Sequence, residues 1–208
     1  TWVLLSTGTD ISLSTVFFIN SEIGWATGGE GVILKTTNSG DNWIVLNTPL
    51  NTILSSIYFI DENNGWACGW NGIIIRTSDG GNNWIIQYSD DKSWLYSIHF
   101  TTEENGWAVG WPGQILFTND GGNNWATQFS GSLFLLNSVV FINNNIGWII
   151  GERGIIMKTD NAGDDWIFQS SGELSHLNKV YFVDANYGWV VGDGGLLLQT
   201  TNGGDSWF

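Results

Sequence analysis

The sequence has very little positive charge. Lys and Arg together supply six of its 208 residues, against 20 Asp and Glu, and the formal net charge is −14. Six cations cannot form the basic stripe that releases counterions from a phosphate backbone, and an acidic chain is repelled by anionic lipid. The composition therefore argues against nucleic acid as a partner and against docking on an anionic membrane surface.

Cysteine and long apolar runs are also scarce. Cys68 is the only cysteine, so an intrachain disulfide framework is excluded. The longest apolar runs fall well short of the roughly 18 residues of a membrane helix, so we expect no membrane insertion. The chain begins at Thr1 inside a repeat, without an initiator Met or a signal peptide, which suggests a mature form or an excised piece.

What the sequence does have is a strict 41-residue repeat. Tryptophan recurs at this interval at Trp2, Trp43, Trp84, Trp125, Trp166 and Trp207. A Gly-Trp pair keeps the same spacing at 24–25, 65–66, 106–107, 147–148 and 188–189. A period of about 40 to 45 residues with four short strands is typical of β-propellers.

Each repeat contains four short β segments separated by Asn and Gly. In the second repeat they span 54–60, 66–69, 73–77 and 84–87. No window keeps the 3.6-residue period of a helix. The sequence therefore predicts an all-β chain, a single β-propeller domain over residues 1–208 with five four-stranded antiparallel blades. The repeats cover about 1–41, 42–82, 83–123, 124–164 and 165–205.

The two ends of the chain suggest how such a ring closes. Residues 2–5 align with the fourth strand at 43–46, and the last repeat stops at Trp207-Phe208, before a fourth strand. We expect the N-terminal strand to complete the last blade and close a five-bladed ring, which removes exposed sheet edges. Because Trp2 and Trp207 occupy the same phase, the alternative is a fragment of a propeller with six to eight blades.

The end of each repeat resembles the Asp-box, or BNR repeat, whose pattern is Ser/Thr-x-Asp-x-Gly-x-x-Trp. The five copies are residues 36–43, 77–84, 118–125, 159–166 and 200–207. Together with Gly-Trp-Ala-x-Gly and Gly-x-Ile-Leu-Lys-Thr upstream, the whole unit resembles the photosystem II stability/assembly-factor-like propellers. This resemblance covers the whole chain, and it implies a propeller that holds a membrane-protein partner during assembly.

The acidic position of the box predicts a structural role. It is held by Asn38, Asp79, Asp120, Asn161 and Asn202. A general acid or base, or a metal ligand, does not tolerate Asn in three copies of five, so we expect no metal and no cofactor. Asn and Asp share a short acceptor that caps the N–H groups of a turn. We expect the closing indoles to act as apolar pegs between blades. They are Trp43, Trp84, Trp125, Trp166 and Trp207.

Three of the 14 tryptophans lie outside this frame. Trp70 and Trp111 fall in the turn between second and third strands, and Trp94 in a loop before a first strand. In a propeller both sets of loops lie at the same end, and aromatic rings at loop tips are typical of binding surfaces. We predict a binding face for a protein or glycan, formed by Trp70, Trp94, Trp111, Phe134, Glu152, Arg153 and His176. The alternative is that the rings plug the mouth of the ring.

Other side chains receive packing roles. Lys35, Arg76 and Lys158 share one slot of the repeat, which we interpret as a solvent-facing strand position. His99 occupies a slot that is aromatic or aliphatic elsewhere, so we expect a half-buried ring with a satisfied nitrogen.

Catalysis is the less favoured hypothesis. Glu152 and Asp193, in equivalent loops of adjacent repeats, are the best carboxylate pair for a glycosidase. A sialidase needs a cluster of Arg, and only Arg76 and Arg153 exist. Gly-x-Ser-x-Gly, phosphate-loop and dinucleotide motifs are missing. The hypotheses are a non-catalytic binding propeller, a glycoside hydrolase-like enzyme, and an architectural unit of a larger surface assembly. The Asn-rich, cysteine-poor composition suggests an extracellular, cell-surface or periplasmic location.

Overall fold

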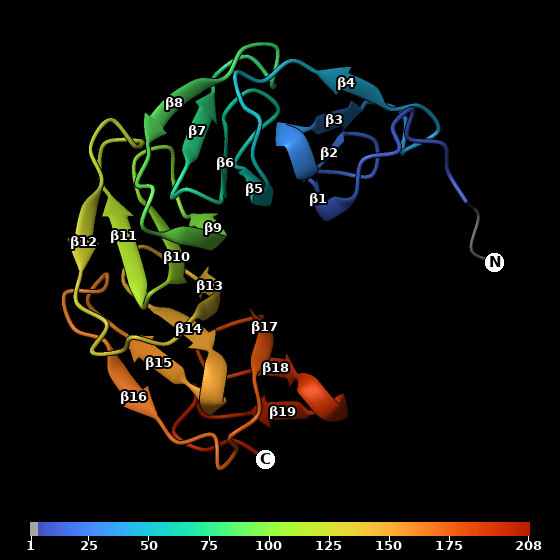
Figure 1. The fold of residues 1–208 in the computed structure, drawn as a ribbon. Helices are drawn as coiled ribbons and strands as arrows, with labels where there is room; N and C mark the ends of the chain where they lie inside the picture. The colour runs from blue at the N-terminus through green and yellow to red at the C-terminus, as the bar shows by residue number, and fades with distance from the viewer. Residues whose placement is uncertain (1–3) are drawn as a thin grey trace. The chain divides into compact units, whose positions relative to one another are not determined.

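The computed structural model describes residues 4–208, and its regular structure consists of β-strands and three short 3₁₀ turns (Figure 1). The chain divides into two compact units, residues 1–92 and 93–208. Each unit is built from consecutive antiparallel sheets, which we call blades because each one corresponds to one sequence repeat. No helix among the described residues is long and apolar enough to cross a membrane.

The first unit contains two four-stranded blades. The strands of the first blade are β1 (Leu13–Phe18), β2 (Gly24–Gly28), β3 (Ile33–Thr36) and β4 (Ile44–Leu46). Those of the second are β5 (Leu54–Phe59), β6 (Gly65–Gly69), β7 (Ile74–Thr77) and β8 (Ile85–Tyr88). In both blades the strands pair in chain order, as a meander. A 3₁₀ turn, η1 (Gly29–Gly31), joins β2 to β3.

The second unit contains three blades. The third blade has β9 (Trp94–Phe100), β10 (Gly106–Trp111), β11 (Gln114–Thr118) and β12 (Ala126–Gln128). The fourth has β13 (Leu136–Phe141), β14 (Gly147–Gly151), β15 (Ile156–Thr159) and β16 (Ile167–Gln169). The last has β17 (Leu177–Phe182), β18 (Gly188–Gly192) and β19 (Leu197–Thr200). The 3₁₀ turn η2 (Glu152–Gly154) joins β14 to β15, and η3 (Asp193–Gly195) joins β18 to β19.

The core of each unit lies between neighbouring blades and is built around stacked aromatic rings. Trp25 of the first blade stacks on Phe59 of the second with ring centroids 3.6 Å apart, and its indole nitrogen donates to the carbonyl oxygen of Gly80 at 3.2 Å. Trp148 stacks on Phe182 in the same way at 3.5 Å. The stacked ring that crosses from one blade to the next therefore belongs to the Gly-Trp pair. The box indole meets the Phe of its own blade edge-on, as Trp84 meets Phe59, and it also packs between blades, since Trp84 lies in one buried cluster with Trp25 of the preceding blade.

The glycine of the Gly-Trp pair makes room for this stack. A Cβ atom at Gly65 would lie about 2.4 Å from the ring of Phe59. Any side chain there would displace the ring that receives the neighbouring indole, because interiors are packed to near-crystalline density. The strict recurrence of Gly before Trp follows from this contact.

The Asp-box turns have the hydrogen bonds expected of caps. Asp79 Oδ1 accepts from the backbone N–H of Asn83 at 2.9 Å, and Asn161 Oδ1 accepts from that of Asp165 at 3.0 Å. Asp and Asn therefore make the same turn hydrogen bond in these two boxes. Hydrogen bonds from the Asn83 side chain and backbone hold the pKa of Asp79 below its ordinary value.

The solvent-facing interpretation of the Lys35 slot is wrong. Lys35 Nζ lies 5.2 Å from the ring centroid of Trp25 and donates to the carbonyl oxygen of Gly80 at 3.0 Å. Arg76 and Lys158 lie over their own Gly-Trp indoles at 5.3 and 5.6 Å. The slot thus places a cation on the face of an indole. Burial is the main cause that lowers the pKa of Lys35.

The predicted closure by the N-terminal strand falls partly on Trp2 and Val3, which lie outside the described residues, and Leu4 and Leu5 belong to no strand. In the last blade, Phe208 exchanges two backbone hydrogen bonds with Gln199, at 2.8 and 3.0 Å. This is the pairing that Ile167 makes with Lys158 in the fourth blade. Phe208 therefore occupies the first position of the fourth strand, where the closing strand was expected.

Candidate functional site

Six of the seven predicted binding residues lie at one end of the second unit and form three contacting pairs. We call Trp94, Trp111, Phe134, Glu152, Arg153 and His176 the loop face. Trp70 belongs to the first unit, in the turn that follows β6, where its backbone N–H donates to the carbonyl oxygen of Ile53 at 2.9 Å. Its side chain is exposed.

The first pair consists of two indoles on neighbouring strands. Trp94 begins β9 and Trp111 ends β10, and the two residues are partners in the antiparallel ladder. Their ring centroids are 5.3 Å apart, with planes inclined at 32°. Trp94 is 39% exposed and Trp111 is 41% exposed. The rings therefore support one another while a large apolar surface stays in contact with solvent, which costs free energy.

The second pair is a cation on an aromatic ring. The guanidinium carbon of Arg153 lies 4.4 Å from the ring centroid of Phe134. Arg153 has φ 56°, and the equivalent turn residues Glu30 and Asn71 have φ 55° and 60°. The left-handed conformation thus recurs at this position of the turn in every blade except the third, where the residue is Pro112. Among residues 4–208 no carboxylate lies within ion-pair distance of Arg153, so its charge is available to a ligand.

The third pair joins a carboxylate to an imidazole. Glu152 Oε1 lies 3.7 Å from Nδ1 of His176, and Glu152 Oε2 accepts from the backbone N–H of Leu135 at 3.4 Å. The backbone N–H of Glu152 donates to the carbonyl oxygen of Leu135 at 2.9 Å, which fixes the turn against the neighbouring loop. Half of the His176 side chain is exposed.

The sequence did not single out Tyr96, which lies near this carboxylate. Burial is the main cause that raises the pKa of Tyr96, and the charge of Glu152 adds to it. Tyr96 occupies a slot that reads Ser14, Ser55, Asn137 and Asn178 in the other repeats. An aromatic ring in a slot of small polar residues is the signal that could have identified it.

The carboxylates of the glycosidase hypothesis already have partners in the chain. Asp193 Oδ1 accepts from the side-chain amide of Asn178 at 2.7 Å, and Glu152 is held by Leu135 and His176. Within residues 4–208 no group of three His, Cys, Asp or Glu side chains is arranged to hold a metal ion. The three pairs together form a surface of aromatic and polar side chains.

The sequence was compared with protein families. The family model described as "Photosynthesis system II assembly factor YCF48" matches residues 41–130 and 86–170, which together cover more than half of the chain. The chain belongs to this family. The comparison of this YCF48-family chain with curated proteins gave no match.

Solved structures give the fold of this YCF48-family chain. A structure titled "YCF48 bound to D1 peptide" is 20% identical with a TM-score of 0.57, over 99% of this chain and 82% of that one. YCF48 from Cyanidioschyzon merolae is 18% identical with a TM-score of 0.75, over 95% and 72%. The Niastella koreensis GH74 enzyme is 13% identical with a TM-score of 0.76, over 94% of this chain and 38% of the enzyme. At these identities the likeness shows the fold alone, and that fold is a β-propeller.

Proposed function

We propose that this YCF48-family chain is a non-catalytic propeller that binds a peptide segment of a protein partner at the loop face. The observation that carries the proposal is the grouping of the Trp94–Trp111 pair, the Arg153–Phe134 pair and the Glu152–His176 pair at one end of the unit. The YCF48 structure with a D1 peptide supports a peptide as the kind of ligand.

The chemistry of the face favours a peptide over a sugar. A sugar ring stacks on one open aromatic face, whereas the two indoles lie against each other and Phe134 is covered by Arg153. What these rings offer is an apolar surface flanked by hydrogen-bond donors and one cation. Peptides match this mixture, because they alternate apolar side chains with backbone carbonyl groups, and aromatic residues and Arg dominate the energetics of such contacts.

Binding of a fluorescent D1 peptide to the purified chain, measured by anisotropy, tests the proposal. We expect Trp111→Ala to weaken binding about tenfold or more, the loss of a single hot-spot side chain. The matched control is Ile167→Ala, which removes an exposed apolar side chain of β16, outside the loop face. Equal affinities of the wild type and Trp111→Ala, with unchanged circular dichroism, would contradict the proposal.

A further inference from the structure

One face of the first blade is exposed although the same face is buried in the second blade. Leu54, Ile57 and Phe59 of β5 are buried against the first blade. Their counterparts one repeat earlier are Leu13, Val16 and Phe18, and Val16 is 60% exposed where Ile57 is 3%. We call Leu13, Val16 and Phe18 the first-blade open face. Three apolar side chains of β1 are therefore exposed to solvent, although they have the same spacing along the strand as the buried core residues of β5.

The last blade has the opposite face exposed. In the fourth blade, Ile150 and Ile156 are buried against the last blade, in one cluster with Trp148 and Leu177. Their counterparts one repeat later are Val191 and Leu197, and Leu197 is 61% exposed where Ile156 is fully buried. We call Trp189, Val191 and Leu197 the last-blade open face. Trp189 is partly exposed, unlike the buried indole of Trp148.

These two faces are the two halves of the contact that recurs inside each unit. In that contact one blade supplies an indole and the next supplies a Phe ring and a carbonyl acceptor. Trp148 stacks on Phe182 and donates to the carbonyl oxygen of Gly203 at 3.1 Å, and Trp107 does the same with Phe141 and Ala162. The last-blade open face carries the donor set, and the first-blade open face carries the receiving set.

Phe18 is already oriented to receive an indole. Its ring meets Trp43 edge-on with centroids 6.0 Å apart, as the ring of Phe59 meets Trp84 at 6.0 Å. Ser39 has φ 63° and lies at the position of Gly80, whose carbonyl oxygen accepts from Trp25. The first blade therefore matches the second blade in the two features that receive an indole, which are the orientation of the Phe ring and the conformation of the turn that supplies the carbonyl acceptor.

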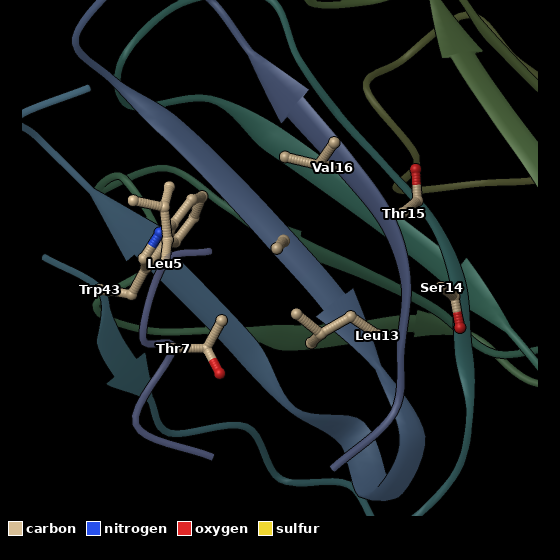
Figure 2. Close-up of a pocket in the computed structure, with 8 residues that line it drawn as sticks. Leu5, Thr7, Leu13, Ser14, Thr15, Val16 and Trp43 are labelled. Atoms are coloured by element: carbon tan, nitrogen blue, oxygen red, sulfur yellow. The ribbon is translucent and has the colours of Figure 1, made fainter. Parts of the chain in front are cut away.

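A hollow of about 370 Å³ lies on the first-blade open face. Figure 2 shows Leu5 beside Trp43 on one side of it, with Leu13 and Val16 of β1 on the other. Leu5 lies against Gly40 as Leu46 of β4 lies against Gly81 of the following blade. Leu5 thus occupies the position that Leu46, from the fourth strand of the preceding blade, occupies beside the second blade. The hollow lies where the inner strands of a blade preceding the first one would place their side chains.

We propose that the first-blade open face is a docking surface for the last-blade open face of a second copy of this chain. The contact continues the interface already present between neighbouring blades, and each copy carries both halves of it. Such a contact is heterologous, because different patches of the two copies meet. The proposal goes beyond peptide binding and does not rest on it.

Two charge variants test the polarity of this contact by light scattering coupled to size exclusion. Phe18→Glu removes the receiving half, and Leu197→Glu removes the donor half. The wild type should exceed its monomer mass of 23.0 kDa increasingly with concentration, and each variant alone should stay at that mass. An equimolar mixture of the two variants should form a 1:1 dimer, since one intact half of each kind remains.

The control is Ile167→Glu, which places the same charge on an exposed residue of β16 outside both faces and should assemble like the wild type. Val16→Glu, at a more exposed position of β1, replaces Phe18→Glu if near-ultraviolet circular dichroism shows that variant unfolded. A wild type that stays at monomer mass at every concentration, through pairing within one molecule or with no pairing, overturns the proposal. So does a mixture of the two variants that stays monomeric.

Discussion

The guanidinium of Arg153 lies over the ring of Phe134, 4.4 Å from the centroid, and the two residues belong to different loops of the second unit. Phe134 precedes β13, while Arg153 lies in the turn between β14 and β15 of the same blade. The contact therefore holds a charged tip and an aromatic ring together before any ligand arrives. Such preorganisation reduces the entropy that a binding partner must overcome.

Removing the positive charge of Arg153 should reduce peptide affinity more than it reduces the stability of the fold. A cation–π pair at an exposed site contributes about 0.5–1 kcal/mol, so Arg153→Gln should lower the free energy of unfolding by no more than that. Peptide affinity should fall by about tenfold, because the proposed site places the cation against the ligand. Urea denaturation and fluorescence anisotropy measure the two effects separately. Arg153→Lys keeps the charge and should retain part of the affinity, and an unchanged affinity for Arg153→Gln would remove Arg153 from the site.

His99 predicts a loss of stability in mild acid. Burial lowers the pKa of His99 from 6.5 to about 4, with a smaller contribution from Lys179, whereas a hydrogen bond with the backbone of Phe141 acts in the opposite direction. The unfolded chain binds a proton below about pH 6.5 and the folded chain does not until about pH 4. The stabilisation provided by the neutral ring is therefore complete above pH 6.5. As the pH falls from 6.5 to about 4, the free energy of unfolding decreases by at most about 3 kcal/mol.

The replacement His99→Tyr isolates this effect, because Tyr occupies the same slot at Tyr58 and Tyr181. Urea midpoints measured from pH 7.5 to 4.5 should fall for the wild type and change much less for His99→Tyr. Parallel curves for the two proteins would show that another group titrates.

The Asp-box predicts that amide and carboxylate are interchangeable and that alanine is not. Asp79 accepts from the backbone N–H of Asn83 and from the hydroxyl of Thr77. Asp79→Asn keeps the acceptor that Asn161 already provides in another box, so its thermal midpoint should stay close to the wild type. Asp79→Ala leaves the turn uncapped and should cost about 1 kcal/mol. Thermal unfolding compares the three proteins, and a stable Asp79→Ala variant would exclude the capping role.

The blade frame could be predicted from sequence because its determinants are local and repeated. Gly65 precedes Trp66 in a pattern found five times, and the contact of Gly65 with Phe59 supplies its cause. The aromatic loop residues were found because Trp94 and Trp111 break that pattern. Their mutual contact, and that of Arg153 with Phe134, depend on the register of strands and the path of loops. A single sequence does not state these distances.

Two interpretations depended on contacts that a sequence pattern does not reveal. Alternation along β3 places Lys35 on the same face as the core residue Ile33, but the sequence cannot reveal that the indole of Trp25 lies beneath its ammonium group. The phase of residues 2–5 identified a fourth-strand segment, but it could not reveal that Leu5 lies against Gly40 of the first blade. In both cases the sequence indicates where a residue lies within its repeat, whereas the side chain that it contacts is determined by packing between segments.

The close approach at Gly65 predicts a severe and specific defect. A methyl group there would lie about 2.4 Å from the Phe59 ring, so Gly65→Ala should destabilise the fold by about 1–3 kcal/mol. Phe59→Leu in the Gly65→Ala background should recover part of that loss by relieving the overlap. Gly172→Ala is the control, since nothing lies within 4 Å of its Cβ position and only its φ of 73° opposes the change. Additive losses in the double variant, measured in urea, would locate the strain elsewhere.

Salt should strengthen the proposed self-association. Each chain carries a formal net charge of −14, whereas the six residues of the two open faces are uncharged. Repulsion between copies therefore opposes a contact whose attraction is apolar, and raising the ionic strength from about 0.01 to 1 M shortens the screening length from about 30 to 3 Å. The apparent dissociation constant from sedimentation equilibrium should fall as NaCl rises, both for the wild type and for the mixture of Phe18→Glu with Leu197→Glu. A contact held by ion pairs would weaken instead, so dissociation in high salt would contradict the apolar interface.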